Sequence, residues 1–181
     1  MQSDIWMLDA SSGEAHNLTG DIWSDFEPAW SPDGNVIVFH SDRGPETELG
    51  RYTSENLALL ETTFDQLDLY LMEPGARYAR RLTVDETWDD RSARFGKDTN
   101  RVVFISDRNG IENLYEKRLD TGSVRPLTDL DVGVMQVAVA SGSDLAALVS
   151  LRRGIPSIYT LRLPFDRNLP RDPLIPNVWA Q

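Results

Sequence analysis

The side chains that most often carry out catalysis are scarce in this sequence. Among 181 residues there is no cysteine, and the only histidines are His16 and His40, which form no His-x-x-x-His pair. No Gly-x-Ser-x-Gly segment is present to hold a serine nucleophile. Four carboxylates lie between residues 85 and 90 and would suit calcium, but the EF-hand spacing is absent. The sequence therefore predicts no catalytic residue, no metal site and no cofactor.

Two acidic segments that contain a tryptophan are alike. Residues 20–27 read GDIWSDFE and residues 85–92 read DETWDDRS, which aligns one tryptophan and one aspartate in each segment. Carboxylates attract cations or basic peptides, and an exposed tryptophan anchors an interface. In the structural alternative, each aspartate accepts backbone hydrogen bonds and each tryptophan packs between repeats. The candidate partner-binding residues here are Trp23, Asp25, Glu27, Trp88, Asp90 and Arg91.

An Asp-Arg pair follows each of two apolar segments. The pairs are Asp42-Arg43 and Asp107-Arg108. A repeated Asp-Arg at the end of a strand is most simply explained as a salt-bridged clamp between neighbouring repeats. We therefore interpret these four residues as structural.

The segments that position these residues occur twice in the sequence. Residues 31–43 read SPDGNVIVFHSDR and residues 96–108 read GKDTNRVVFISDR, with seven of thirteen positions identical. The β-branched and aromatic runs predict strands, and their nearly continuous apolar character predicts burial on both faces. The Asp, Asn and Gly residues before each run predict a tight turn. Each unit therefore reads as a series of short strands joined by turns.

The spacing of the units predicts a propeller. An aromatic residue recurs at Trp6, Tyr70, Tyr115 and Tyr159, and the last two steps are 45 and 44 residues. The first step is 64 residues, and its excess of about 20 lies in an insertion at 44–67. A period near 44 with about four strands per unit is typical of propeller blades. We expect an all-β fold, a partial β-propeller of three to four blades with four antiparallel strands each.

The repeat resembles that of the TolB-like β-propeller family, a relative of the WD-type repeat. The family pattern is Pro-x-Trp-Ser-Pro-Asp-Gly, an apolar strand, Ser-Asp-Arg-x-Gly, an aromatic strand and Arg-x-Leu-Thr. Its first element is matched at residues 28–34, its middle at 106–115 and its end at 80–83. The resemblance covers residues 4 to about 162 and assigns structural repeat roles to Trp30, Asp33, Gly34, Asp42, Arg43, Asp107 and Arg108.

The predicted blades do not make a closed ring. We expect a half blade at 4–19, full blades at 25–83 and 89–128, and three strands of another at 134–162, within a propeller that spans residues 1–163. A closed propeller needs about 4–8 blades. The open ends would expose apolar faces and strand edges. We therefore expect this chain to be part of a longer protein, or to have its ring completed by a second copy or a partner.

Two segments lie outside the repeat pattern. In the insertion at 44–67, Ser54 could cap a short helix whose apolar face includes Leu57, Leu60, Phe64 and Leu67. We expect it to lean over the side of the propeller where blades connect, with Leu57 and Phe64 as partner-binding candidates; the alternative is a helix that only caps a hydrophobic edge. Residues 164–181 are rich in proline and read as a linker or a terminal arm.

The net charge and the length of the apolar runs limit the classes of partner. The net charge is −11, and this field repels phosphate backbones and anionic headgroups. No apolar run approaches the roughly 18 residues that span a bilayer. We expect a protein or peptide partner, with no nucleic acid and no membrane insertion.

Two functions fit these expectations. The first is a non-catalytic protein-interaction scaffold, and the resemblance implies a bacterial envelope protein in the periplasm or elsewhere outside the cytoplasm. The second is an accessory or gating propeller of a peptidase similar to prolyl oligopeptidase or tricorn, with the catalytic domain outside this sequence. A Gly-x-Ser-x-Gly segment after the proline-rich tail would favour the peptidase.

Overall fold

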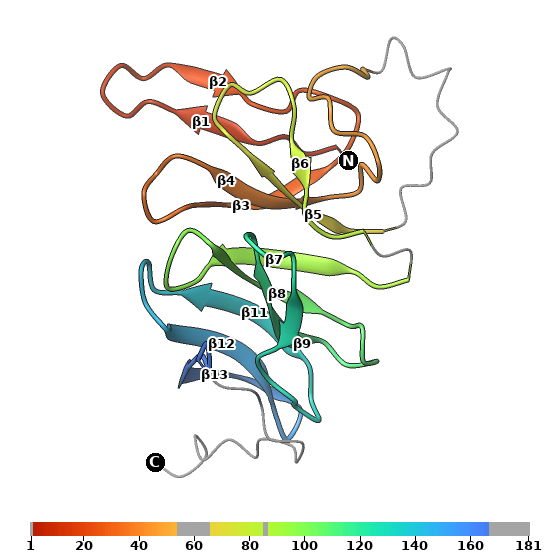
Figure 1. Ribbon diagram of the computed structural model, residues 1–181, viewed down its shortest axis with the longest axis vertical. Coiled ribbons are helices and arrows are strands. Elements are labelled where there is room, and N and C mark those ends of the chain that lie inside the picture. The colour runs from red at the N-terminus through yellow and green to blue at the C-terminus, as the bar shows by residue number, and fades with distance from the viewer. Residues whose placement is uncertain (1, 54–65, 85–86, 167–181) are drawn as a thin grey trace.

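The computed structural model describes residues 2–53, 66–84 and 87–166, and these residues are all-β. They form thirteen strands in four antiparallel sheets, and none of them is helical. Figure 1 shows the sheets following one another down the molecule in the order of the sequence. The prediction of a partial propeller with four-stranded blades is confirmed.

The first sheet, here called the half blade, contains β1 (Trp6–Leu8) and β2 (Ala15–Asn17). Blade 1 contains, in spatial order, β3 (Asp25–Trp30), β4 (Ile37–Ser41), β5 (Asp68–Met72) and β6 (Arg80–Arg81). Blade 2 contains β7 (Asp90–Phe95), β8 (Arg101–Ser106), β9 (Asn113–Arg118) and β10 (Val124–Pro126). Blade 3 contains β11 (Val134–Val139), β12 (Leu145–Arg152) and β13 (Ile155–Arg162).

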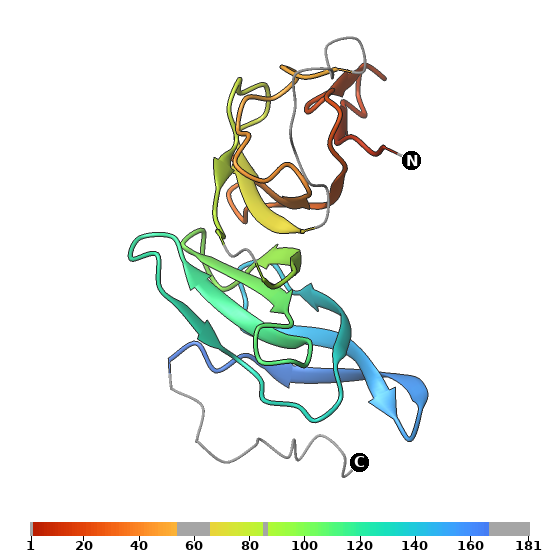
Figure 2. The same cartoon turned by 90° about the vertical axis from the view of Figure 1, so that its right-hand side faces the viewer.

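The strands in the middle of a blade are buried on both faces, as their apolar runs predict. In β8, Val103 and Ile105 pack toward blade 3, whereas Val102 and Phe104 pack toward blade 1. Among the described residues, apolar clusters lie between the half blade and blade 1, between blades 1 and 2, and between blades 2 and 3. Full burial of one such side chain contributes about 1.5–3 kcal/mol. Packing of side chains between neighbouring sheets therefore holds the blades together. Figure 2 shows the same sheets turned by 90°.

The first strands of the blades, β3, β7 and β11, form what we call the inner wall. They contact one another in this order. Each of them has an irregular register where it pairs with the second strand of its blade. At these bulges Glu27 and Ser92 adopt left-handed φ angles of 47° and 55°, which residues other than glycine rarely do. A bulge redirects side chains, so the inner wall presents polar groups at these positions.

Two sides of the molecule are distinguished by their connections. The turns that join first to second strands lie on one side, at the left of Figure 1, and we call this the turn side. The connections between second and third strands, and those between blades, lie on the opposite side, the loop side. The predicted turn at Ser31 is typical: its hydroxyl oxygen accepts from the N–H groups of Asn35 and Val36, and Gly34 has a φ of 73°.

Part of the described insertion lies along the outer edge of blade 1 and not over the loop side. Residues 47–49 run along the outer edge of blade 1, where Ala79 N donates to Thr47 O at 2.8 Å and Leu49 N donates to Arg77 O at 2.9 Å. The predicted helix, with its candidate residues Leu57 and Phe64, lies outside the described residues. The prediction of a helix therefore stays untested.

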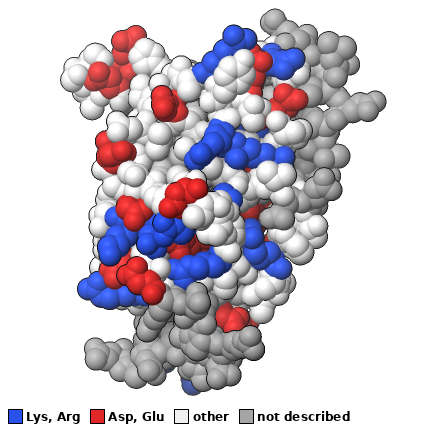
Figure 3. All heavy atoms as spheres, viewed as in Figure 1, with Lys and Arg blue, Asp and Glu red and all other residues white. Residues whose placement is uncertain are grey.

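Charged side chains of both signs are mixed on the surface. In the lower half of Figure 3 basic and acidic groups lie next to one another. Blade 2 contains several ion pairs, such as Arg118 with Asp120 at 2.7 Å. In the part of the chain that is described, no helix has the length and apolar character to cross a membrane.

Candidate functional site

The first Asp-Arg pair does not pair with itself. The guanidinium of Arg43 donates to Asp25 at 2.6 Å, to Asp21 at 3.0 Å and to the Ser41 hydroxyl at 3.2 Å. The side chains of Arg43, Asp21 and Asp25 are fully buried. The guanidinium also lies 5.6 Å from the ring centre of Trp23 and 5.6 Å from that of Tyr70. Arg43 thus links the start of β3 to the end of β4, within one blade.

Blade 2 repeats this arrangement. Arg108 Nη2 donates to both carboxylate oxygens of Asp90, at 2.9 and 3.0 Å, and its Nε donates to the Ser106 hydroxyl at 3.0 Å. Its guanidinium lies 4.9 Å from the ring centre of Tyr115. The interpretation as a clamp between neighbouring repeats is therefore wrong in one respect. The clamp closes within a blade, because the aspartate that starts the first strand lies beside the end of the second.

Blade 3 has lost the clamp. Ser150 pairs with Val134, just as Ser41 pairs with Asp25 and Ser106 with Asp90. Val134 is buried among apolar side chains, so the position of the clamp acid is apolar. Arg152 stands where the other blades have the clamp arginine, and it is exposed. The arginine is thus shielded in the two blades that have the acid and exposed in the blade that lacks it.

The aspartates beside the clamp arginines have a different role. Ser24 N donates to Asp42 Oδ1 at 2.8 Å, and Asp89 N donates to Asp107 Oδ1 at 3.0 Å. Both bonds hold the segment that leads into the first strand of the same blade. Each Asp-Arg pair therefore holds the start of its blade's first strand by two contacts. The aspartate accepts a backbone hydrogen bond, and the arginine forms the clamp.

The Trp–acid candidates are divided between core and surface. Trp23 is 0% exposed and packs edge-on against Tyr52 with the ring centres 5.4 Å apart. Asp25 and Asp90 are buried in the clamps, whereas Trp88 is half-buried and its carbonyl accepts from Gln66 at 2.8 Å. The structural alternative describes Trp23, Asp25 and Asp90, because a buried side chain offers no surface to a partner.

The remaining two candidates connect the inner strands. Arg94 Nη2 donates to the Glu27 carboxylate at 2.9 Å, which joins β7 to β3. Arg91 donates to Met135 O at 3.2 Å and forms an ion pair with Glu112, which joins β7 to β11. Burial would raise the pKa of Glu27, but its hydrogen bonds with Arg94 and Ser92 outweigh this and lower the pKa. Glu27 therefore stays charged on the inner wall.

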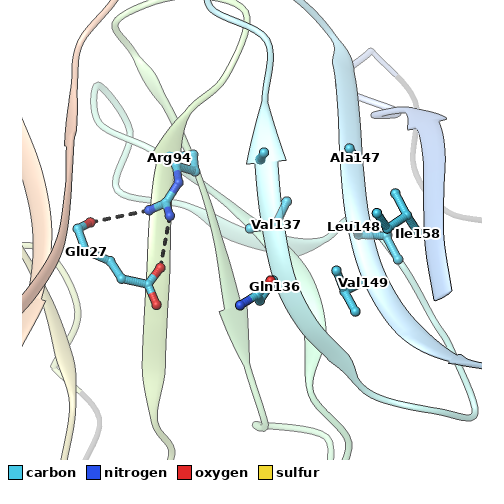
Figure 4. A pocket seen from close by; sticks show the side chains of 9 residues that line it. Glu27, Arg94, Gln136, Val137, Ala147, Leu148, Val149 and Ile158 are labelled. Atoms are coloured by element: carbon cyan, nitrogen blue, oxygen red, sulfur yellow. Dashed lines mark hydrogen bonds and ion pairs between the residues drawn. The ribbon is translucent and has the colours of Figure 1, made fainter. Parts of the chain in front are cut away.

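A hollow of about 410 Å³ opens beside this ion pair. Figure 4 shows Glu27 and Arg94 at one end, Gln136 on β11 in the middle, and Val149 and Ile158 at the other end. Ile158 is 77% exposed. The hollow therefore combines a charged pair with exposed apolar side chains of blade 3.

Two buried titratable groups lie close to the inner wall. Burial raises the pKa of Asp21 to about 6, although Arg43 opposes this, and the nearby Asp25 raises it further. Burial lowers the pKa of His40 to about 4. Nδ1 of His40 accepts from Ser92 N at 3.4 Å, and its ring stacks on Phe26. At neutral pH His40 is therefore an uncharged contact between blades 1 and 2.

The other assigned residues lie at strand ends. Trp30 is 49% exposed at the end of β3. The Asp33 carboxylate accepts from Ser31 Oγ at 2.5 Å and Asn35 N at 3.2 Å, and Gly34 completes the same turn. Within the described ranges, no group of three or more His, Asp or Glu side chains is placed to hold a metal ion. Asp85 and Glu86 lie outside those ranges.

Sequence reasoning missed Asp21 and Arg94. Asp21 completes the buried clamp and also accepts from Gly50 N at 3.2 Å, which attaches the insertion to blade 1. A signal existed, because Asp21 aligns with Glu86 in the two acidic segments. Arg94 gave no such signal, since the equivalent residue of blade 1, Ala29, is not basic. Its partner Glu27 is reached only because of the bulge.

Comparison with known proteins agrees with this architecture. No family model matches the chain. A curated relative, dipeptidyl-peptidase 5 from Porphyromonas gingivalis, is 28% identical over 131 residues, which are 70% of this chain and 16% of the relative. The chain thus spans about a sixth of the length of this relative.

Two solved structures show the same fold at low identity. A protein from Agrobacterium tumefaciens described as TolB superposes with a TM-score of 0.66 at 19% identity, over 89% of this chain and 53% of its own. The β-propeller domain of the Trilobed protease from Pyrococcus furiosus, which has an open velcro topology, superposes with a TM-score of 0.53 at 17% identity, over 87% of this chain and 40% of its own. The chain therefore has the TolB-like β-propeller fold.

Proposed function

We propose that this chain is a non-catalytic β-propeller segment that binds polypeptide. The observation that carries the proposal is the use of the repeated polar residues. Asp25, Arg43, Asp90 and Arg108 close clamps inside their blades, so none of them is available as a reactive group. The hollow that holds the Glu27–Arg94 pair also includes exposed apolar residues of blade 3, and this surface is suited to binding a polypeptide.

The proposed contact surface is the inner wall with its hollow. The Glu27 side chain is 46% exposed at one end of the hollow, Gln136 is exposed in its middle, and Ile158 is exposed at its other end. Peptide recognition commonly combines an apolar anchor with a few charged groups that set its orientation. The negative net charge of the chain favours a partner segment that carries basic residues.

The segment would work in a longer protein outside the cytoplasm. The likeness to the TolB structure supports the location outside the cytoplasm. The chain spans only 53% of that structure and 16% of dipeptidyl-peptidase 5, which supports a longer protein. We propose residues 1–163 as the propeller part and the residues from 164 onward as the segment that leaves it.

A second candidate is an accessory propeller beside a peptidase catalytic domain. The observation in its favour is the 28% identity to dipeptidyl-peptidase 5. In that case the polypeptide at the inner wall would be substrate on its way to the active site rather than a lasting partner.

Site-specific photo-cross-linking in the full-length parent tests the proposal. A photoreactive residue at Glu27 should cross-link to a polypeptide, and the adduct should weaken at least tenfold when Ile158→Lys is added. The same photoreactive residue at Arg118, the last residue of β9, serves as the control. Equal adducts at both positions, or none at Glu27, would reject the inner wall as the binding surface.

An activity assay on the full-length parent separates the two candidates. Hydrolysis of dipeptidyl substrates that continues after inner-wall substitution, but with altered size selection, would identify the peptidase accessory. Binding without hydrolysis would identify the scaffold. Hydrolysis by the 181-residue chain alone would contradict both.

A further inference from the structure

A polar cluster breaks the repeat at one place in blade 2. Glu116 pairs with Val103 in the sheet, at the position where blade 1 has Leu71 opposite Val38. Glu116 is nevertheless 1% exposed. A buried carboxylate in place of an apolar residue is costly unless cations and hydrogen bonds compensate for it.

Two arginines compensate for the charge of Glu116. Arg101 Nη1 donates to Glu116 Oε1 at 2.9 Å, and Arg125 Nε donates to Glu116 Oε2 at 2.7 Å. Arg101 stands where blade 1 has Val36, so it also departs from the repeat. Glu116 thereby fixes the orientation of both guanidinium groups.

The outward donors of these arginines hold the chain just after β13. Arg125 Nη2 donates to Pro164 O at 3.0 Å and to Phe165 O at 2.7 Å, and Arg101 Nη1 donates to Phe165 O at 3.1 Å. Leu163 N donates to Asp144 O at 2.7 Å. Two backbone carbonyls in succession are therefore bound by side chains that belong to another blade.

A slot receives the phenylalanine ring. Phe165 is 6% exposed, and the Arg101 guanidinium lies 5.2 Å from its ring centre. A Cβ atom added at Gly96 would lie 2.8 Å from Cζ of Phe165, so the ring occupies the space that any larger residue would fill. The absence of a side chain at Gly96 is thus a requirement of the slot.

This segment supplies what an outer strand supplies elsewhere. Leu119 and Val124, from the β9–β10 hairpin, pack against the cluster between blades 1 and 2. Within the described residues blade 3 has three strands, and Leu163 and Phe165 join the cluster between blades 2 and 3 instead. The two side chains cover the part of blade 2 that a fourth strand of blade 3 would cover.

We propose that residues 163–166 form an exit strap, bound by a dedicated receptor made of Arg101, Glu116, Arg125 and the slot over Gly96. The strap holds blade 3 onto blade 2 and fixes the point, on the turn side, from which the following chain departs. The receptor recognises a segment with an aromatic side chain and two free carbonyls, and its position does not depend on what the inner wall binds.

A distance measurement between spin labels tests the strap. Because the chain has no cysteine, labels can be placed at Asp166→Cys in the strap and at Thr121→Cys in the β9–β10 turn of the 181-residue chain. A docked strap gives one narrow distance distribution. Gly96→Ala, which blocks the slot, and Arg125→Lys, which removes the forked donor, should broaden it at least twofold. Arg118→Lys, on the same hairpin and paired with Asp120, should leave it unchanged.

A second measurement distinguishes loss of the strap from a change in the whole fold. In hydrogen exchange, Phe165→Ala should speed exchange of the amides of β13 about tenfold, and Gly96→Ala should add little to it because the ring is already gone. A broad distance distribution in the labelled 181-residue chain without further substitution would overturn the proposal, and so would a narrow one that survives both Gly96→Ala and Arg125→Lys. So would full additivity of Gly96→Ala and Phe165→Ala.

Discussion

At the scale of single residues, the same arginine has opposite surroundings in different blades. Arg43 is buried between two carboxylates, whereas Arg152, at the equivalent position of blade 3, is exposed, and Val134 stands there at the position of the clamp acid. Breaking a buried ion pair leaves an uncompensated charge, which costs far more than losing an exposed one. These two positions therefore form a matched pair for mutagenesis.

Arg43→Ala should lower the free energy of unfolding by about 3–5 kcal/mol, because Asp21 and Asp25 are left buried without a cation. Arg152→Ala should change it by less than about 0.5 kcal/mol. Urea denaturation of both variants measures the difference. Similar losses in the two variants would show that the clamp contributes nothing specific.

Asp21 should make the protein more stable in mild acid. Its pKa in the folded state is about 6, above the ordinary value of 3.8, so the folded state binds more protons than the unfolded state between these values. Relative to Asp21→Asn, the wild type should therefore gain about 2 kcal/mol as the pH falls from 6 to 4. Denaturant midpoints at several pH values test this, and a constant difference would contradict it.

His40 should act in the opposite direction. Its folded pKa is about 4 and its ordinary value is 6.5, so the unfolded state takes up the proton first. Stability that comes from the neutral ring is present above pH 6.5 and is lost as the pH falls toward 4. The wild type should lose stability relative to His40→Gln over that range, by a similar amount. A parallel pH profile for the two proteins would rule out this assignment.

At the scale of elements, the second strand of each full blade is the centre of the packing. Phe104 is 0% exposed in β8, whereas Phe26 is 37% exposed in β3. Phe104→Ala should cost about 3–5 kcal/mol, because it removes buried surface and leaves a cavity. Phe26→Ala should cost clearly less. Thermal unfolding of both variants provides the comparison, and equal costs would place the core elsewhere.

The strands could be predicted from the sequence because each repeat contains its own β-branched runs and turn residues. The β-branched runs of β4 and β8 and the Ser31 turn follow from local chemistry, and their repetition predicted the length of a blade. The connections could not be predicted in the same way. Whether Arg43 binds within or between blades depends on how the start of β3 meets the end of β4, and the Glu27–Arg94 pair depends on a bulge. Neither has a signature in residue spacing.

At the scale of the whole molecule, the two end sheets expose apolar side chains. Trp6 and Leu8 are 62% and 65% exposed on the half blade, and Ile158 is 77% exposed on blade 3. Exposed apolar faces and free strand edges favour association. The net charge of −11 opposes it at low salt.

We therefore expect the 181-residue chain to self-associate as its concentration and the salt concentration rise. Ile158→Lys should shift the association to at least tenfold higher concentration. Val132→Lys, at a loop residue that is 42% exposed, serves as the control. Sedimentation velocity measures the effect, and a chain that stays monomeric throughout would contradict it.

The central claim is that the repeats are radial blades that follow one another around an inner wall, with the half blade and blade 3 at opposite ends. Cysteine pairs in the cysteine-free chain, joined by a short thiol-reactive cross-linker at high dilution, test it most directly. The account predicts that Glu27→Cys and Arg94→Cys join within one molecule, and that Trp6→Cys and Ile158→Cys do not. An intramolecular link between residues 6 and 158, or none between 27 and 94, would contradict it.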